Sequence, residues 1–382
     1  MTEMGIADGN SVATIDDQHR RVHVERRDNG ESTRERAVLT TLTNISFNGA
    51  YQAHFWIGSG NRSKADQAAV NGMAAVLGTE FCDHDLPGLI VSGEGERDEA
   101  PMLYEGESFG PAGEVRVKFA VDPLEGTNPA AEGQPNAISV IAAAILPDGD
   151  FHFVPDAYFY KLVVAEEAKG LMRIGDVSTG EPFFCYLSSN LRALADAYGI
   201  DIRDVVVMVL DRPRNRELIT GIRDVGAQAR TFPDGDITAG WQAVNDEHDV
   251  HAYMGIGAAP EGLIGSAITS VHRGEMYLAP WIPTPNDKEW GNTPKDVPRE
   301  QHPFYRQFVQ AGLEVDRVYR HDELAIGTVM YSMTFVTDTL GHKGIKALRR
   351  GGFFGETIYG RSGSGTWYSR LGRHPNPPER LI

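Results

Sequence analysis

Asp122-Pro123-Leu124-Glu125-Gly126-Thr127 is the stretch of this sequence that points most directly to a fold and a chemistry. The segment before it, 115–121, alternates apolar with other side chains, and this spacing predicts a strand that ends at Asp122. The apolar face of that strand carries Val115, Val117, Phe119 and Val121. Pro123 then restricts the backbone of the turn. The stretch therefore places two carboxylates, those of Asp122 and Glu125, directly after a buried strand.

The rest of the chain alternates strand patterns with helix patterns. We expect helices over 37–56, from 63 through 77, over 215–225 and over 261–271, and strands over 89–91, 205–210, 228–232 and 250–254. Segments 137–146 and 150–154 flank Pro147-Asp148-Gly149, which predicts a hairpin. Residues 281–303 contain five prolines and little periodicity, which predicts a long loop. The alternation favours an α/β fold of layered helices and sheets.

The composition of the two ends sets the expected domain boundaries. Residues 1–33 are polar and mixed in charge and predict a mobile tail, and residues 363–382 predict a polar, proline-rich C-terminal tail. Residues 34–362 form the expected folded unit, with two sub-domains over about 34–200 and 201–362. A chain of 382 residues is long enough for one large domain or two moderate halves.

The charge balance limits the partners of the protein. With 53 acidic and 36 basic residues the net charge is −17, and such a surface repels nucleic acid. It also repels small phosphorylated molecules, so any phosphate site must bring cations or local Arg and Lys side chains. No run of 18 apolar residues and no apolar N-terminal segment occurs, so we expect a cytoplasmic protein without a membrane partner.

Two carboxylates held as close as Asp122 and Glu125 need cations between them, because their mutual repulsion would otherwise raise the pKa of one of them. Hard carboxylate oxygens suit Mg²⁺ or Mn²⁺, and the two cysteines of the chain form no Cys-x-x-Cys pair that suggests zinc. Gly126 would let a phosphate approach the backbone, and the Thr127 hydroxyl could position a water or a phosphate oxygen. A solvated turn after a strand is the alternative interpretation.

Three further acidic positions strengthen the metal interpretation. Glu94 lies between glycines directly after an apolar strand, although an exposed acidic loop is the ordinary interpretation of the run 93–99. Asp66 lies on the same helical face as Ala69, so it points inward, where a buried carboxylate needs a partner. Glu261 opens a helix, and its alternative role is a favourable interaction with the helix dipole.

Several motifs occur along the chain in one order: Ala65-Asp66, Gly93-Glu94-Gly95-Glu96-Arg97-Asp98-Glu99-Ala100-Pro101-Met102-Leu103-Tyr104, Asp122 to Thr127, Pro155-Asp156-Ala157-Tyr158, Arg212-Pro213-Arg214, Asp234-Gly235-Asp236 and Gly255 to Gly262. Jointly they resemble the bacterial class II fructose-1,6-bisphosphatases over roughly residues 37–337. The resemblance implies a metal-dependent phosphatase of sugar phosphates that self-associates as a dimer or tetramer. It also implies the layered α-β-α-β-α fold of the lithium-sensitive sugar phosphatases.

The resemblance further implies roles for individual residues. The metal ligands are Asp66 and Glu94 for one ion, and Asp122, Glu125 and Glu261 for another. The substrate contacts are Glu125, Gly126, Thr127, Tyr158, Arg212, Arg214, Asp234, Asp236 and the backbone near Ala258. Two guanidiniums suit a non-reacting phosphate and two carboxylates suit sugar hydroxyls, although ordinary surface charge is the alternative for the two arginines.

The implied reaction is metal-assisted, in-line hydrolysis of a phosphate ester. Thr127, hydrogen-bonded to Asp98, would orient or deprotonate the attacking water, with Asp98 as the base. The alternative for Asp98 is a supporting role in which it holds Arg62.

The sequence departs from the family pattern mainly around the site. Asn61-Arg62 stands where the family has Asp-Lys, Ala258 where a glycine approaches the sugar phosphate, Tyr160 where an acid is usual, and Phe335 where a glycine is usual. The stretch 281–303 also looks unlike the family. We therefore expect a working phosphatase whose substrate is fructose 1,6-bisphosphate, sedoheptulose 1,7-bisphosphate or another phosphorylated sugar of a specialised pathway.

Other classes of function compete with this interpretation. A catalytically silent regulator would bind sugar phosphates without hydrolysing them, and the intact acids argue against it. Phosphatases of inositol or nucleotide phosphates share the Asp-Pro-x-Asp/Glu-Gly-Thr turn, but the Gly-Glu-Gly-Glu stretch favours the sugar bisphosphatase branch. A nucleotide-binding protein is disfavoured, because no Gly-x-x-x-x-Gly-Lys-[Ser/Thr] loop occurs.

Overall fold

The computed structural model describes residues 2–5, 11–16, 21–26, 33–83, 86–93, 102–245, 248–339, 341–349, 351–363 and 366–374. The chain divides into two compact units: unit 1 is Met1–Asp150 with Gly327–Ile382, and unit 2 is Phe151–Ile326. This division differs from the expected one near residue 200. The chain leaves the sheet of unit 1 at the end of β7 (Ile138–Phe151) and returns in the adjacent strand β14 (Ala325–Phe335), so unit 2 is an insertion between neighbouring strands.

Unit 1 carries an 11-stranded sheet within the described residues. In order across the sheet its strands are β1 (Thr2–Gly5), β2 (Ser11–Asp16), β3 (Arg21–Arg26), β17 (Thr366–His374), β16 (Phe353–Arg361), β14, β7, β6 (Val117–Glu125), β4 (Gly88–Ser92) and β5 (Ser108–Phe109), with β15 (Lys346–Ala347) paired to β16. Strands β4 and β6 are parallel, whereas β6 and β7 are antiparallel. The sheet is therefore mixed.

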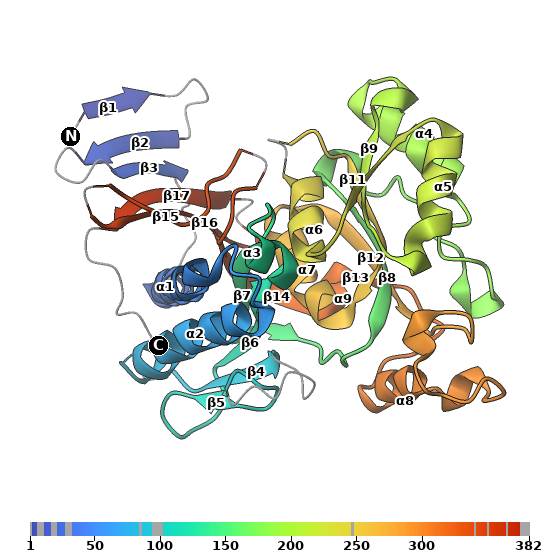
Figure 1. Ribbon diagram of the computed structural model, residues 1–382, viewed down its shortest axis with the longest axis horizontal. Coiled ribbons are helices and arrows are strands. Elements are labelled where there is room, and N and C mark those ends of the chain that lie inside the picture. Colours follow the sequence, from blue (N-terminus) through green and yellow to red (C-terminus); the bar gives the residue numbers. More distant parts are fainter. Residues whose placement is uncertain are drawn as a thin grey trace. The chain divides into compact units, whose positions relative to one another are not determined.

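The two ends of the chain meet in this sheet, where the sequence predicts tails. Strand β3 pairs with β17, and His23 lies opposite Arg370 in the register. Strand β17 in turn pairs with β16 along its whole length (Figure 1). Pairing of the polar ends with each other and with β16 satisfies their backbone hydrogen bonds, and composition alone does not predict such long-range pairing.

Two long helices cover one face of the sheet of unit 1. Helix α1 (Thr33–Ala53) packs along α2 (Arg62–Asp83), and both contact β6 (Figure 1). The buried cluster between them includes Leu42 and Ile45 from α1, Met73 from α2, and Phe119 and Ile141 from the sheet. The predicted helices over 37–56 and from 63 are confirmed and extend further. The alternating face of the strand before Asp122 therefore supplies one side of the core.

The predicted hairpin around Pro147-Asp148-Gly149 is wrong. These residues lie inside β7, which runs without a turn over 14 residues. A β-carbon at Gly149 would lie 2.0 Å from the carbonyl oxygen of Thr328, and one at Gly327 would lie 2.2 Å from that of Asp148. The two glycines let the backbones of β7 and β14 approach closely, so the segment stays extended beside its neighbour rather than turning back.

Unit 2 is built on a six-stranded sheet within the described residues. Its strands are, in order, β10 (Gln228–Phe232), β9 (Val206–Leu210), β11 (Ala252–Ala258), β8 (Tyr158–Val164), β12 (Glu275–Trp281) and β13 (Tyr319–Arg320). The predicted strands and helices of this region are confirmed, with bounds that differ by a few residues. The segment 282–302 is irregular apart from two 3₁₀ turns, Lys288–Trp290 and Arg299–Gln301, which confirms the predicted loop.

Helices pack against both faces of this second sheet. Leu162 and Val164 of β8 belong to a buried cluster with α4 (Leu187–Tyr198) and α5 (Arg216–Val225). The intervening Val163 instead faces Gly240 of α6 (Asp236–Val244), and α7 (Ala259–Val271) packs beside α6. The shorter helices are α3 (Thr127–Glu132) in unit 1, and α8 (Pro303–Gln310) and α9 (His321–Leu324) in unit 2. The molecule is therefore a mixed α/β protein with two sheets.

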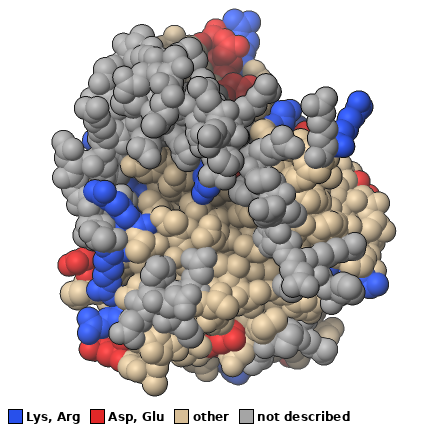
Figure 2. Space-filling view, turned by 90° about the vertical axis from the view of Figure 1, so that its left-hand side faces the viewer, with Lys and Arg blue, Asp and Glu red and all other residues tan. Residues whose placement is uncertain are grey.

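On the face shown in Figure 2, the acidic residues that the structure describes do not form one patch. Small groups of acidic residues lie apart there, and basic residues lie near some of them. Among the described residues, no helix is long and apolar enough to cross a membrane.

His321 at the start of α9 supplies a test of the core of unit 2. The imidazole is buried, and its Nδ1 accepts a hydrogen bond from the Met276 backbone N–H at 3.2 Å. Burial lowers the pKa of His321 to about 4, against the nearby charge of Asp322, which raises it. Between pH 4 and 6.5, His321 therefore binds fewer protons in the folded protein than in the unfolded chain. Its contribution to stability is fully present above pH 6.5 and is lost as the pH drops toward 4.

We expect the free energy of unfolding to fall by about 2 kcal/mol between pH 6.5 and 5 on account of His321 alone. His321→Asn keeps an acceptor for Met276 and does not titrate, so its unfolding free energy in urea should depend less steeply on pH than that of the wild type. Equal slopes for the two proteins would contradict the assignment.

Candidate functional site

A β-bulge places the two central carboxylates of unit 1 on one face of the sheet. In the pairing of β6 with β7, Asp122 lies opposite Val140 and Glu125 lies opposite Ile138. Three steps along β6 thus match two steps along β7, so β6 carries one extra residue. Paired residues share a face, and Val140 and Ile138 are two apart, so Asp122 and Glu125 point the same way. In a regular strand, residues three apart would point to opposite faces.

Local hydrogen bonds stabilise the turn that follows the bulge. Asp122 Oδ1 accepts a hydrogen bond from the Leu124 N–H at 3.1 Å, and the Thr127 hydroxyl donates one to the Leu124 carbonyl at 2.9 Å. Gly126 has φ +78°, and a β-carbon there would lie 2.8 Å from the carbonyl oxygen of Asn136. Only glycine fits this position without strain. The sequence predicts that the strand ends at Asp122, but the bulge lets it continue to Glu125.

The helix that carries Asp66 packs against this strand. Asp66 lies in the first turns of α2, next to the buried Ala65, and α2 contacts both β6 and α3. Glu94 and Asp98 lie outside the described residues. In the part of the chain that the structure describes, no three His, Cys, Asp or Glu side chains form a group that could hold a metal ion. Unit 1 therefore contributes a carboxylate pair on one strand and a third carboxylate on an adjoining helix.

The predicted substrate residues of unit 2 gather at one edge of its sheet. Strand β9 is parallel to both β10 and β11, so the carboxyl ends of the three strands lie at the same edge. The residues that follow these ends are Arg212 and Arg214 after β9, Asp234 and Asp236 after β10, and Glu261 after β11. Ligands of open α/β sheets bind at this kind of edge. Tyr158 begins β8 and lies opposite Ala258 in the register.

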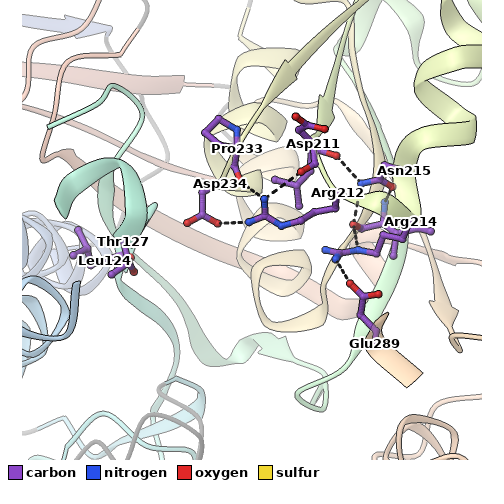
Figure 3. A network of polar contacts seen from close by, with 11 residues as sticks. Leu124, Thr127, Asp211, Arg212, Arg214, Asn215, Pro233, Asp234 and Glu289 are labelled. Atoms are coloured by element: carbon purple, nitrogen blue, oxygen red, sulfur yellow. Dashed lines mark hydrogen bonds and ion pairs between the residues drawn. The ribbon is translucent and has the colours of Figure 1, made fainter. Parts of the chain in front are cut away.

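Each of the two predicted phosphate-binding arginines is paired with a carboxylate (Figure 3). Arg212 donates to the carbonyl of Pro233, and its Nη2 lies 3.2 Å from Asp234 Oδ1. Arg214 donates through Nε to the Ile256 carbonyl at 3.0 Å and through Nη1 to Glu289 Oε1 at 2.6 Å.

Asn215 supports this pair of strand ends. Its side-chain amide donates to the Leu210 carbonyl at 3.0 Å, and its Oδ1 accepts from the Ile256 N–H at 2.8 Å. It therefore ties the end of β9 to β11 beside the two arginines.

Asp236 lies at the centre of a buried polar cluster. Its Oδ2 accepts hydrogen bonds from Lys161 Nζ at 2.7 Å and from the Tyr253 hydroxyl at 2.9 Å. The Lys161 side chain is 1% exposed and that of Asp236 is 5% exposed. A β-carbon at Gly257 would lie 1.7 Å from Asp236 Oδ2, so this glycine makes room for the cluster. The sequence predicts that Asp236 contacts a sugar hydroxyl directly. One of its two carboxylate oxygens already accepts two hydrogen bonds from the protein.

Glu261 lies in the first turn of α7 and is half-buried, with its Oε2 shielded from water. Among the described residues its Oε2 has no hydrogen-bond partner. Burial and then the charge of Asp236 raise the pKa of Glu261 to about 7, against the opposing charge of Lys161. A shielded carboxylate oxygen of this kind is stabilised by a proton or by a further cation, and a divalent metal ion is one such cation. The Glu261 carboxylate therefore fits a cation, but the described residues form no group of three metal ligands around it.

Three residues that the structure places at this edge are not predicted from the sequence. They are Lys161, Asn215 and Glu289. The signal for Lys161 is present in the sequence, since it is a lone charge between the apolar residues Phe159 and Val164. A buried lysine is rare unless it is paired. Asn215 and Glu289 carry no such signal, because an amide before a helix and a charge in a loop are both ordinary.

The Lys161–Asp236 ion pair generates a stability prediction. Lys161→Met leaves the carboxylates of Asp236 and Glu261 without their cation, and removal of one partner of a buried pair costs about 3–5 kcal/mol. We expect a loss of this size in urea unfolding. Adding Asp236→Asn to Lys161→Met should restore part of it, because the uncompensated charge is gone.

Lys169→Met is the matched control, because Lys169 is exposed in the same unit and donates only one long hydrogen bond, of 3.4 Å, in the described contacts. Its loss should stay within about 0.5 kcal/mol. Equal losses for Lys161→Met and Lys169→Met would contradict the assigned role of Lys161.

Comparison with known proteins assigns the chain to a family. The family described as "Bacterial fructose-1,6-bisphosphatase, glpX-encoded" matches residues 36–370. The chain is 35% identical over 314 residues to the D-fructose 1,6-bisphosphatase class 2/sedoheptulose 1,7-bisphosphatase of Thermosynechococcus vestitus, which covers 78% of this chain and 84% of the relative. It is 34% identical over 318 residues to the protein of that name from Prochlorococcus marinus strain NATL1A, which covers 82% and 88%. The chain therefore belongs to the family of bacterial, glpX-encoded fructose-1,6-bisphosphatases.

Proposed function

We propose that this protein is a phosphoric monoester hydrolase that removes phosphate from a sugar bisphosphate, either fructose 1,6-bisphosphate or sedoheptulose 1,7-bisphosphate. Two similar cyanobacterial proteins carry both substrates in their names. The observation that carries the proposal is the bulge in β6, which aims Asp122 and Glu125 to one face directly before the glycine turn. Paired carboxylates on a rigid strand are what a divalent cation and a phosphate ester require.

The proposed metal ligands are five carboxylates. Asp66 and Glu94 would hold one ion, and Asp122, Glu125 and Glu261 a second. The incompletely paired carboxylate of Glu261 supports its place in the second set. Bound Mg²⁺ or Mn²⁺ would polarise the phosphoryl oxygens and neutralise the charge that develops on the leaving oxygen.

The proposed substrate contacts divide by charge. Arg212 and Arg214 would attract the phosphate that does not react, and Asp234 would accept a hydrogen bond from a sugar hydroxyl. Tyr158 would pack against the sugar beside Ala258, its partner in the register. The remaining members of the proposed substrate set are Glu125, Gly126, Thr127 and Asp236.

Thr127 and Asp98 are the proposed catalytic residues. The Thr127 hydroxyl donates to the Leu124 carbonyl, which fixes the side chain at the start of α3 and leaves its oxygen as an acceptor. In the proposed step, water attacks the phosphorus and Asp98 takes one proton of the water, while the bond from phosphorus to the sugar oxygen breaks and that oxygen takes up a proton from solvent to leave as the hydroxyl. We propose in addition that the chain has the layered α-β-α-β-α fold of the lithium-sensitive sugar phosphatases.

A phosphate-release screen tests the proposal. Purified full-length protein with Mg²⁺ or Mn²⁺ should release phosphate from fructose 1,6-bisphosphate or sedoheptulose 1,7-bisphosphate, and chelation of the metal should stop the release. Release from a different sugar or nucleotide phosphate alone would favour the alternative phosphatase. Binding of sugar phosphates without release under any condition would favour a silent regulator.

Substitution of the carboxylates tests the site itself. Glu125→Gln should abolish most turnover, because the amide lacks the charge that holds a cation. Glu132→Gln removes an exposed acid seven residues further along the chain and should leave turnover unchanged. Similar turnover in both variants would argue against the site.

Asp98→Asn should lower kcat by about 10²- to 10⁴-fold, as expected for loss of a general base, and should leave metal affinity unchanged. The measurements are steady-state kinetics and a Mn²⁺ titration. A near-normal kcat would refute the role of Asp98 as the base.

A further inference from the structure

The segment 282–302 of unit 2 is attached to the sheet edge that carries the predicted substrate residues. Its Trp290 is buried, donates through Nε1 to the Thr293 carbonyl at 2.8 Å, and packs at a tilt against His302 with ring centroids 4.7 Å apart. His302 in turn packs on Phe304, whose ring lies 5.5 Å from that of Tyr158. The segment is therefore packed through aromatic rings against Tyr158, one of the proposed substrate contacts.

Glu289 of this segment forms an ion pair with the guanidinium of Arg214. Their closest atoms, Glu289 Oε1 and Arg214 Nη1, are 2.6 Å apart, and their side chains are 13% and 6% exposed. The guanidinium also lies over the ring of Tyr158, with Cζ 4.6 Å from the ring centroid. The Ile256 carbonyl, the Tyr158 ring and the Glu289 carboxylate thus surround Arg214. Figure 3 shows the pairing of Arg214 with Glu289.

The second arginine is held differently. The distance between Arg212 Nη2 and Asp234 Oδ1 is 3.2 Å, and the two side chains are 32% and 26% exposed. Water therefore screens the Arg212–Asp234 pair far more than the buried Arg214–Glu289 pair. A phosphate can reach Arg212 with little rearrangement. A phosphate that binds Arg214 must either displace the Glu289 carboxylate or lie beside this second negative charge where little water screens the repulsion.

We propose that Glu289 is a specificity-determining residue, an internal anion that disfavours a phosphate at Arg214 relative to an uncharged group of the substrate. This proposal rests on the proposed function, because it takes Arg214 as a place for the non-reacting phosphate. Glu289 belongs to the segment that departs from the family pattern, so it would adjust the substrate range without altering the carboxylates that carry out the chemistry. Its side chain acts on binding at the non-reacting end, and its effect therefore falls mainly on KM.

The kinetic test compares one bisphosphate with its monophosphates. The quantity measured is the ratio of kcat/KM for fructose 1,6-bisphosphate to the larger of the kcat/KM values for fructose 1-phosphate and fructose 6-phosphate. Glu289→Gln keeps the shape and an acceptor for Arg214 but removes the charge. We expect the ratio to rise about tenfold, mainly through a lower KM for the bisphosphate.

Asp316→Asn is the matched control, since it removes one acidic charge from an exposed ion pair with Arg299 in the same unit. Its ratio should stay within about twofold of the wild type. A ratio for Glu289→Gln that stays within that range, or falls, would overturn the proposal.

A binding measurement separates this proposal from the proposed function. Inorganic phosphate is titrated into the metal-free protein by calorimetry. Glu289→Gln should bind phosphate about tenfold more tightly than wild type and Asp316→Asn, and the gain should vanish in Glu289→Gln/Arg214→Met. If no sugar phosphate is hydrolysed, the proposed function fails, while this titration still decides the role of Glu289. If Glu289→Gln does not fold, Glu289→Ala replaces it in the kinetic and the binding experiment. Equal phosphate affinities in the variant and the wild type would contradict the proposed role of Glu289.

Discussion

A carboxylate that is removed from water must receive hydrogen-bond donors or an opposite charge, and this requirement organises the functional edge of unit 2. Asp236 meets it at one oxygen, because Lys161 and Tyr253 both donate to Oδ2, whereas its buried Oδ1 has no hydrogen-bond partner among the described residues. Glu261 is half-buried, its Oε2 likewise has no partner there, and its pKa is raised to about 7. One cation from a side chain thus serves two acids. The remaining deficit of positive charge supports the proposed role of Glu261 as a ligand for a divalent ion.

In unit 1 the corresponding constraint is geometric. A strand alternates its side chains, so carboxylates three residues apart would normally diverge. One extra residue in β6 relative to β7 removes this divergence and turns Asp122 and Glu125 to the same face. Pro123 lies between them and has no N–H to pair in the ladder, which suits it to an irregular position. Gly126 then reverses the backbone with a positive φ, and α3 begins at the next residue.

The pairing of both arginines with carboxylates is consistent with the acidity of the whole chain. A protein with a net charge of −17 must recognise an anion with a small number of local cations. Both arginines at the edge are held in place by carboxylates, which fixes their orientation and also reduces their attraction for phosphate. The difference in exposure between the two pairs makes one arginine the easier to reach. In the proposed site, selectivity between phosphorylated groups would depend on the acids that accompany the arginines as much as on the arginines themselves.

The sequence by itself determined the secondary structure around the site and the chemical class of its residues. Strand 115–121, the helices that carry Asp66 and Glu261, and the α/β class follow from short-range periodicity and turn residues, because these patterns act over a few neighbouring positions. The ordered motifs also indicated the family, since their joint occurrence is far more specific than any one of them. The hairpin at Pro147 was predicted wrongly for the same reason: its local signal was overridden by the close approach of β14.

Only the tertiary structure decided which charges meet. Lys161 and Asp236 are 75 residues apart in the chain, as are Arg214 and Glu289, and no local pattern encodes either contact. The bulge between Asp122 and Glu125 likewise depends on the register with β7, a property of two strands rather than one. Burial strengthens these ion pairs and raises the free energy of the ionised Glu261 carboxylate. It arises from packing across the whole unit and therefore appears only when the chain is folded.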